Sequence, residues 1–291
     1  MNDGEITLCE GVLVGSLRRA VNRSVRSSGT IHDESVAARL GLRGAPVAGS
    51  VHMDLFPPLL GAAFGARCWT AGTLSLYFLN ATLDREPVRA FVKQPHDSGD
   101  GQVDVWVERE DGLRVAEGTA SVGRSREPSA LMRRPPDRFA SAKLRILAGI
   151  DAGDPMEAAD VVCTPAAHAE RVDIITEPLD IYRTSKYGGP VVTPAGYVEL
   201  LFAAPVEAVS RRCQINGAIG LFGAIELRNV NGPLIVGRTY KVGGEIVAVG
   251  ESPKTEYFWF ESWADDLEGT RIASHRMLAR YMKNSSVLYA E

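Results

Sequence analysis

His32 opens the stretch of this chain whose residue types could do chemistry. It stands beside Asp33 and Glu34, and the pair Gly49-Ser50 follows a short distance along the chain. An imidazole titrates near neutral pH, so His32 can carry a proton or activate a water molecule, and an adjacent carboxylate such as Asp33 could orient its ring. These residue types predict proton-transfer chemistry. The alternative is an ordinary polar helix start, where an acid is favoured by the helix dipole.

Residues 47–60 are expected to form a mostly apolar helix that begins near Gly49 and Ser50 and carries His52 and Asp54. Backbone N–H groups at a helix start are unpaired and carry partial positive charge. Those of Gly49 and Ser50 could therefore stabilise an oxyanion, with a simple helix cap as the alternative. His52 and Asp54 would be costly to bury alone, so they are either catalytic groups or a hydrogen-bonded structural pair.

A second apolar helix is expected over residues 197–211, directly after Gly196. Glu199 lies three residues after Gly196 and is the carboxylate comparable with Asp54 in the first helix. It is a candidate catalytic acid, or else an acid that complements the helix dipole. Tyr187 and Thr193 precede this helix and could line a substrate pocket, although capping is the favoured role for Thr193.

Composition bounds the class of protein. The chain has 291 residues, 45% hydrophobic and 23% charged, as expected for one large or two ordinary globular domains. A net charge of −4 argues against a nucleic-acid partner. The four cysteines form no C-x-x-C pair, which argues against zinc and predicts reduced thiols in the cytoplasm. The acidic first residues lack a signal-peptide pattern, and no apolar run is long enough for a membrane span.

The chain alternates strand patterns with the two helices. Strands are expected over 5–14, 72–83, 88–93, 102–108, 113–122, 171–182, 220–230, 236–249, 255–263 and 271–281. Between them lies a proline-rich segment with a short helix expected around 138–147. We therefore predict an N-terminal unit over 1–125, a linker over 126–169 and a C-terminal unit over 170–291.

The second unit repeats the first. Three pairs of anchors keep their order at offsets of 147, 149 and 157 residues: Gly49 with Gly196, Asn80 with Asn229, and Gly112 with Gly269. At the same offset from Gly196 as His32 has from Gly49, the chain has Leu179. We therefore expect one active site per chain, in the N-terminal unit.

The stretch 31–60 resembles the hotdog-fold acyl-CoA proteins, specifically the MaoC-like (R)-enoyl-CoA hydratases. The matching features are His32 with its neighbouring acids, Arg39-Leu40-Gly41, and Pro46-Val47-Ala48-Gly49 opening an apolar helix. The catalytic Asp of that family falls at Ser27, and its Asn at Gly29. The resemblance covers about 5–125 and 170–283 and implies an α+β double hotdog, in which each of two units wraps an antiparallel sheet around a central helix.

The resemblance also implies an acyl-CoA substrate, with coenzyme A as part of it and no other cofactor or metal. The favoured activity is a thioesterase, in which His32 and a helix carboxylate activate water while Gly49 and Ser50 hold the oxyanion and Gly196 contacts substrate. The first alternative is an enoyl-CoA hydratase or dehydratase, although Ser27 removes a usual partner of His32. The second is a non-catalytic acyl-CoA binding protein.

Two further expectations follow from the resemblance. Because paired hotdog units form one pseudo-dimer, the chain is expected to be either a monomer or a homo-oligomer. The composition, rich in Ala, Arg and Gly, is similar to that of double-hotdog thioesterases in bacterial diterpenoid pathways such as that of platensimycin. This places the chain in secondary metabolism as an expectation.

Overall fold

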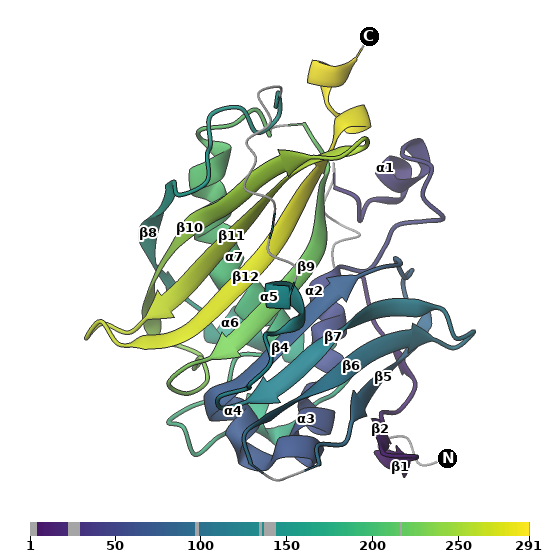
Figure 1. Ribbon diagram of the computed structural model, residues 1–291, viewed down its shortest axis with the longest axis vertical. Coiled ribbons are helices and arrows are strands. Elements are labelled where there is room, and N and C mark those ends of the chain that lie inside the picture. The colour runs from purple at the N-terminus through teal and green to yellow at the C-terminus, as the bar shows by residue number, and fades with distance from the viewer. Residues whose placement is uncertain are drawn as a thin grey trace.

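A single antiparallel sheet of 12 strands organises the chain (Figure 1). The computed structural model describes residues 5–22, 30–96, 99–133, 136, 144–215 and 217–290. The strand order is β1-β2-β5-β6-β7-β4-β9-β12-β11-β10-β8, with β3 beside β5. Strands β1 to β7 belong to the N-terminal unit and strands β8 to β12 to the C-terminal unit, so the two units join where β4 pairs with β9.

The N-terminal unit contains the strands that the alternating patterns predicted and one short strand, β3, that they did not predict. They are β1 (Thr7–Cys9), β2 (Val12–Val14), β3 (Arg18–Arg19), β4 (Gly72–Phe78), β5 (Pro87–Lys93), β6 (Gly101–Arg109) and β7 (Arg114–Val122). A tight turn closes the β6–β7 hairpin at Gly112, whose φ of 82° favours glycine. The expected strand over 5–14 is a hairpin of two short strands.

The C-terminal unit begins earlier than predicted. Its strands are β8 (Pro155–Val162), β9 (Gly220–Asn229), β10 (Thr239–Glu251), β11 (Thr255–Asp265) and β12 (Arg271–Met282). β8 pairs with β10 although it lies in the segment 126–169 that was predicted as linker. The helix expected around 138–147 falls mostly outside the described residues, and 144–147 are not helical.

The strand predicted over 171–182 is wrong, because this region consists of the end of a helix, a turn and irregular segment over 173–179, and a 3-10 turn. α6 (Pro165–Val172) ends there and the 3-10 turn η4 (Asp180–Tyr182) follows. The Thr164 hydroxyl caps α6 by accepting from the Ala167 N–H, and Pro165 occupies the first helical position, where its missing N–H costs nothing.

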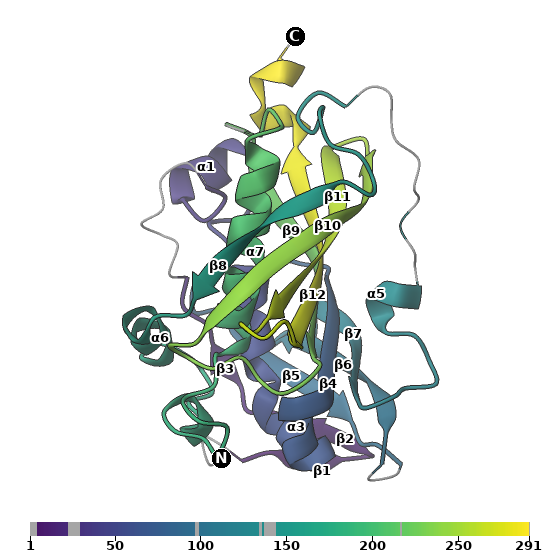
Figure 2. The same ribbon diagram turned by 90° about the vertical axis from the view of Figure 1, so that its left-hand side faces the viewer.

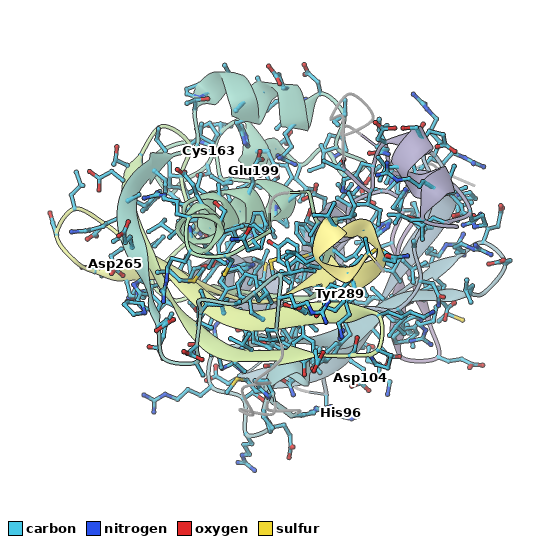
Figure 3. All side chains as sticks on the ribbon, turned by 90° about the horizontal axis from the view of Figure 1, so that it is seen from above. His96, Asp104, Cys163, Glu199, Asp265 and Tyr289 are labelled. Carbon is cyan, nitrogen blue, oxygen red and sulfur yellow. The ribbon has the colours of Figure 1, made fainter. Side chains whose placement is uncertain are left out.

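Each unit places one central helix against the concave face of the sheet (Figures 2 and 3). In the C-terminal unit this is α7 (Pro194–Ser210), 17 residues long. In the N-terminal unit the helix is broken into α2 (Gly49–His52), η2 (Met53–Leu55) and α3 (Pro57–Phe64). Pro57 lacks an N–H group, so a regular helix cannot run through it. This is the double hotdog arrangement that the resemblance implied.

Shorter helices complete the chain. They are α1 (Glu34–Arg39), η3 (Gly65–Arg67), α4 (Cys68–Ala71), α5 (Ala130–Arg133), η5 (Lys283–Ser285) and η6 (Val287–Tyr289). α5 lies on the face of the sheet opposite α7 (Figure 2). There the Leu131 N–H donates to the Ser75 hydroxyl and the Ser129 hydroxyl donates to Glu226, so the connecting segment is fixed over the β4–β9 junction.

One hydrophobic core spans both units. Buried side chains from α3 and β4, such as Leu59 and Leu76, belong to the same cluster as Leu201 on α7 and Ile225 on β9. Two polar contacts also join the units: Arg18 donates two hydrogen bonds to Glu177, and the Ala195 N–H donates to Asp54. The units therefore depend on each other for burial.

The internal duplication has a local two-fold centre at the β4–β9 junction. Ser75 pairs there with Glu226, which lies 151 positions later in the sequence. Near this pair, each residue of the N-terminal unit corresponds to the residue 151 positions later in the C-terminal unit. Asn80 and Asn231 share this offset, and each donates its amide to a carbonyl of the adjacent strand, Arg114 or Arg271. Asn231, rather than the predicted Asn229, is therefore the counterpart of Asn80.

The helix starts correspond at a different offset. The N-caps are Ala48 and Thr193, which are 145 residues apart, so Gly49 corresponds to Pro194 rather than to Gly196. Asp54 corresponds to Glu199 at the same offset. The glycine match predicted from sequence was wrong by two positions, because residue type alone does not locate a cap.

Candidate active site

A cavity of about 340 Å³ lies between the two units and brings together His32, Ser50 and Glu199. Ser50 comes from the start of α2 and Glu199 from the first turns of α7, while His32 precedes α1. Figure 3 shows Glu199 between α7 and α6, on the helical side of the sheet. Three of the residues predicted for one site are therefore neighbours, although they come from different units.

One ring nitrogen of His32 is held by a hydrogen bond, and the other has no hydrogen-bond partner among the residues that the structure describes. Its Nδ1 lies 2.6 Å from the carbonyl oxygen of Pro46. Because a carbonyl only accepts hydrogen bonds, Nδ1 carries a proton, and in the neutral tautomer that this contact selects Nε2 keeps its lone pair. A neutral imidazole with a free Nε2 in a cavity wall has the form that a general base requires.

Asp33 does not orient the His32 ring, contrary to the prediction. Its carboxylate accepts hydrogen bonds from the N–H and the hydroxyl of Ser35, at 2.9 and 2.7 Å, and caps α1. The Pro46 carbonyl fixes the ring instead. Asp33 is not among the cavity-lining residues.

The start of α2 supplies a donor to the cavity. Its N-cap is Ala48, which has no side chain that could cap the helix, and the N–H groups of Gly49 and Ser50 donate to no residue in the described part of the chain. Ser50 lines the cavity and Gly49 does not. A Cβ on Gly49 would lie 3.0 Å from the Phe78 ring, so this glycine serves close packing.

His52 is buried away from the cavity. Its Nε2 lies 2.8 Å from the Thr82 hydroxyl, which ties the helix to the loop after β4. Burial lowers the pKa of His52 to about 4, so its ring is neutral at physiological pH. The structure therefore favours the structural alternative for this residue over the catalytic one.

Asp54 caps the central helix of the other unit. Its carboxylate accepts from the Ala195 N–H at 2.8 Å, at the start of α7. Burial raises the pKa of Asp54 to about 7, and the Ala195 hydrogen bond and the charge of Arg171 offset part of that rise. Asp54 does not line the cavity, so its predicted role as a catalytic carboxylate is not supported by its position.

The start of α7 has no free donor for substrate among the described residues, which corrects the prediction for Gly196, whereas the cap favoured for Thr193 is confirmed. The Thr193 hydroxyl accepts from the Gly196 N–H, and neither residue lines the cavity. Ala195 donates its N–H to Asp54, and Pro194 has none. Tyr187 lies instead in a surface groove beside Trp69.

Glu199 lines the cavity in an ion pair with Arg171 of α6. The Glu199 side chain is 68% exposed and that of Arg171 only 17%, so the pair lies at the cavity mouth. Sequence reasoning missed Arg171 because 171–182 was expected to be a strand. The Thr164-Pro165 pair, a cap followed by proline, is the signal that could have revealed the helix.

Aromatic side chains form the apolar wall of the cavity. Phe202 of α7 and Phe222 of β9 both line it and contact each other edge to face, with ring centroids 5.2 Å apart. Neither residue was among the predicted site residues. The cavity thus offers a proton acceptor, a backbone donor and an apolar surface, which together suit an acyl group with a polar reacting end.

Ser27 and Gly29, which occupy the Asp and Asn positions of the hydratase pattern, lie outside the described residues. Across the helices that the structure describes, none is long and apolar enough to cross a membrane.

The fold is shared with known structures, although no family model and no curated protein matches this sequence. A conserved hypothetical protein of Mycobacterium tuberculosis with a double hotdog fold superposes with a TM-score of 0.63 at 11% identity, over 97% of this chain and 100% of that one.

Two dehydratases give further matches. A MaoC domain protein from Chloroflexus aurantiacus, named as a dehydratase, gives a TM-score of 0.59 at 14% identity, over 97% of this chain and 98% of that one. The GphF dehydratase gives 0.54 at 11% identity, over 96% and 97%. Structures named as thioesterases also match. The strand order, the two central helices and the superpositions on the Mycobacterium tuberculosis protein and the two dehydratases together show that the chain has the double hotdog fold.

Proposed function

We propose that this chain hydrolyses an acyl thioester, with coenzyme A as the thiol. The observation that supports this most is that His32, with Nε2 free, lines the same cavity as Ser50, whose N–H is unpaired within the described chain. Hydrolysis requires one base and one oxyanion site. This cavity offers both without the Asp that the hydratase pattern would place at position 27.

In the proposed reaction His32 accepts a proton from a water molecule while the oxygen of that water attacks the carbonyl carbon of the thioester. The Ser50 N–H donates to the developing oxyanion. The carbon–sulfur bond then breaks, and His32 returns the proton to the departing thiolate. The acyl group packs against Phe202 and Phe222.

Hydration of an enoyl thioester is the second candidate, and one feature of the cavity favours it. Glu199 lines the same cavity as His32, so a carboxylate and an imidazole could act on adjacent carbons of an enoyl group. Two of the superposed structures are named as dehydratases. In this chain, however, Glu199 is engaged in an ion pair with Arg171 and its side chain is 68% exposed, at the mouth of the cavity and not inside it.

Product mass separates these activities. The protein is incubated with a panel of saturated and 2-enoyl acyl-CoAs, and the products are weighed by mass spectrometry. Free CoA and carboxylic acid from saturated substrates are the expected result. Gain of one water with CoA still attached, confined to enoyl substrates, would instead establish the hydratase. No change with any substrate, together with measurable binding, would favour the non-catalytic acyl-CoA binder. The identity of the acyl group and the place of the reaction in secondary metabolism stay predictions.

A further inference from the structure

A second cavity, of about 80 Å³, lies between the two units. It borders a different face of α7 from the face that lines the His32 cavity. α7 contributes Pro194 and Tyr197 to this cavity, which we call the apolar chamber, and Ala195, Val198 and Glu199 to the His32 cavity. The two share no lining residue. They are therefore separate sites with α7 as a common wall.

The local two-fold relates the surroundings of the two cavities. The His32 cavity lies between the start of α2, the middle of α7 and Phe222 near the start of β9. The apolar chamber lies between the start of α7, the helix α3 and Gly72-Thr73 at the start of β4. No His, Asp, Glu, Lys or Arg lines the chamber. It can therefore hold an apolar group but has no strong acid or base for proton transfer near neutral pH.

A surface groove meets the apolar chamber at Trp69, which lines both. The groove runs past the small residues Gly61 and Gly65 of the N-terminal unit to Lys186 and Tyr187 of the C-terminal unit. Small residues leave space, and Trp69 and Tyr187 offer flat apolar surfaces. The chamber and the groove are therefore adjacent at Trp69, and Lys186 is the only charged residue among the described residues that line either of them.

Lys186 is that charged residue, and no described carboxylate forms an ion pair with it. Its Nζ lies 5.5 Å from the centroid of the Tyr187 ring. The loop that carries both is fixed by Ser185, whose hydroxyl accepts from the Tyr187 N–H and donates to the Gly189 carbonyl. A preformed, uncompensated cation in an apolar groove is complementary to an anion.

Arg238 on the far side of Tyr187 is less suitable for this role. It donates to the Tyr187 carbonyl at 3.3 Å and faces a neighbouring groove that Asp266 and Glu268 also line. An anion in that groove would therefore meet two carboxylates as well as Arg238. Lys186 is therefore the anion-binding residue that the geometry selects.

We propose that the apolar chamber and the Lys186 groove bind a short-chain carboxylate, with the carboxylate at Lys186 and the hydrocarbon chain entering past Trp69. An apolar cavity of about 150 Å³ can hold benzene, so about 80 Å³ accommodates about three or four carbon atoms. The rest of the chain lies along the groove. This site does not depend on the activity proposed for the His32 cavity, although that hydrolysis would release a product of this chemistry.

Isothermal titration calorimetry with sodium hexanoate tests the proposal on the full-length protein, and 1-hexanol is the uncharged match. Both are expected to bind, hexanoate more tightly. Lys186→Gln is expected to weaken hexanoate about two- to fivefold, the range for a contact between exposed charges, and to leave 1-hexanol unchanged. Leu60→Trp fills the chamber and is expected to abolish binding of both.

The controls separate this site from the His32 cavity. His32→Ala is expected to leave hexanoate binding unchanged. Circular dichroism checks that Leu60→Trp folds, and Thr73→Leu narrows the chamber from the β4 wall if it does not. Absence of hexanoate binding to the wild type overturns the proposal. So does binding that survives the filled chamber, or binding that His32→Ala removes.

Discussion

His32 and Asp33 are adjacent in sequence but have different surroundings. His32 lines the cavity with its Nε2 free, whereas Asp33 caps α1. We predict that His32→Gln lowers kcat/KM for thioester hydrolysis by about 10²- to 10⁴-fold, the contribution of a general base, with little change in melting temperature. Asp33→Asn, which keeps a good cap, is the matched control and should retain activity. A larger loss in Asp33→Asn than in His32→Gln would reverse the assignment.

Asp54 gives the chain a pH dependence of stability. Its pKa is about 7 when folded, against 3.8 for an ordinary Asp, so the folded state binds its proton more tightly. The stability from this group is complete below about pH 4 and is lost as the pH rises through about 7, up to about 4 kcal/mol. Burial lowers the pKa of His52 from 6.5 to about 4, so the contribution of this residue to stability decreases as the pH falls below about 6.5.

Comparison with Asp54→Asn isolates this group, because both proteins keep His52. We predict that the free energy of unfolding of the wild type, minus that of the variant, decreases between pH 4.5 and 7.5. Urea denaturation at several pH values measures it. A difference that is constant with pH would show that Asp54 is ionised throughout the range.

Residue types located His32, Ser50 and Glu199 from sequence because each has a distinctive chemical group near a recognisable helix start. They did not identify Asp54 as a cap. Its partner is the backbone N–H of Ala195, 141 positions away, and because nearly every residue has such a group, residue type does not reveal it. Phe202 and Phe222 were missed for a similar reason, since a core phenylalanine and a pocket phenylalanine have the same sequence pattern.

At the scale of elements, the close pairing of β4 with β7 requires a glycine at position 118. A Cβ on Gly118 of β7 would lie 1.8 Å from the Ser75 carbonyl oxygen of β4. Because this oxygen belongs to the backbone, rotation of a side chain cannot relieve the clash. We predict that Gly118→Ala lowers the free energy of unfolding by about 3 kcal/mol or more, because β4 must shift and it also carries the junction with β9.

Gly61 within α3 is the contrasting position. A Cβ there would meet nothing within 4 Å, so Gly61→Ala should raise the free energy of unfolding by about 0.5–1 kcal/mol through helix propensity. Chemical denaturation of the two variants checks both values. Equal effects at the two positions would contradict the packing described for β7.

The sequence predicted strands and central helices well because their periodicities are local. It failed at β8 and α6, where the proline-rich segment suggested a linker. β8 has only its pairing with β10 to define it, and its side chains are mostly exposed, so it shows no buried alternation. Local patterns cannot reveal an edge strand whose stability comes from its neighbour.

At the scale of the whole molecule, the two units share one sheet and one hydrophobic core. Arg18 and Glu177 form a two-bond ion pair between them, and Asp54 of one caps α7 of the other. We therefore predict a single cooperative unfolding transition in calorimetry, with calorimetric and van't Hoff enthalpies equal. Two resolved transitions would show that the units fold independently.

The central claim, that His32 directs water to a thioester carbonyl, is tested most directly by a single turnover in H₂¹⁸O with enzyme in excess over acyl-CoA. Direct attack by water predicts free CoA and a carboxylic acid that carries one ¹⁸O in this first turnover. Acid that contains only ¹⁶O would indicate an anhydride formed with a protein carboxylate. An ¹⁸O-labelled product with CoA still attached would indicate hydration, and either result would contradict the proposed mechanism.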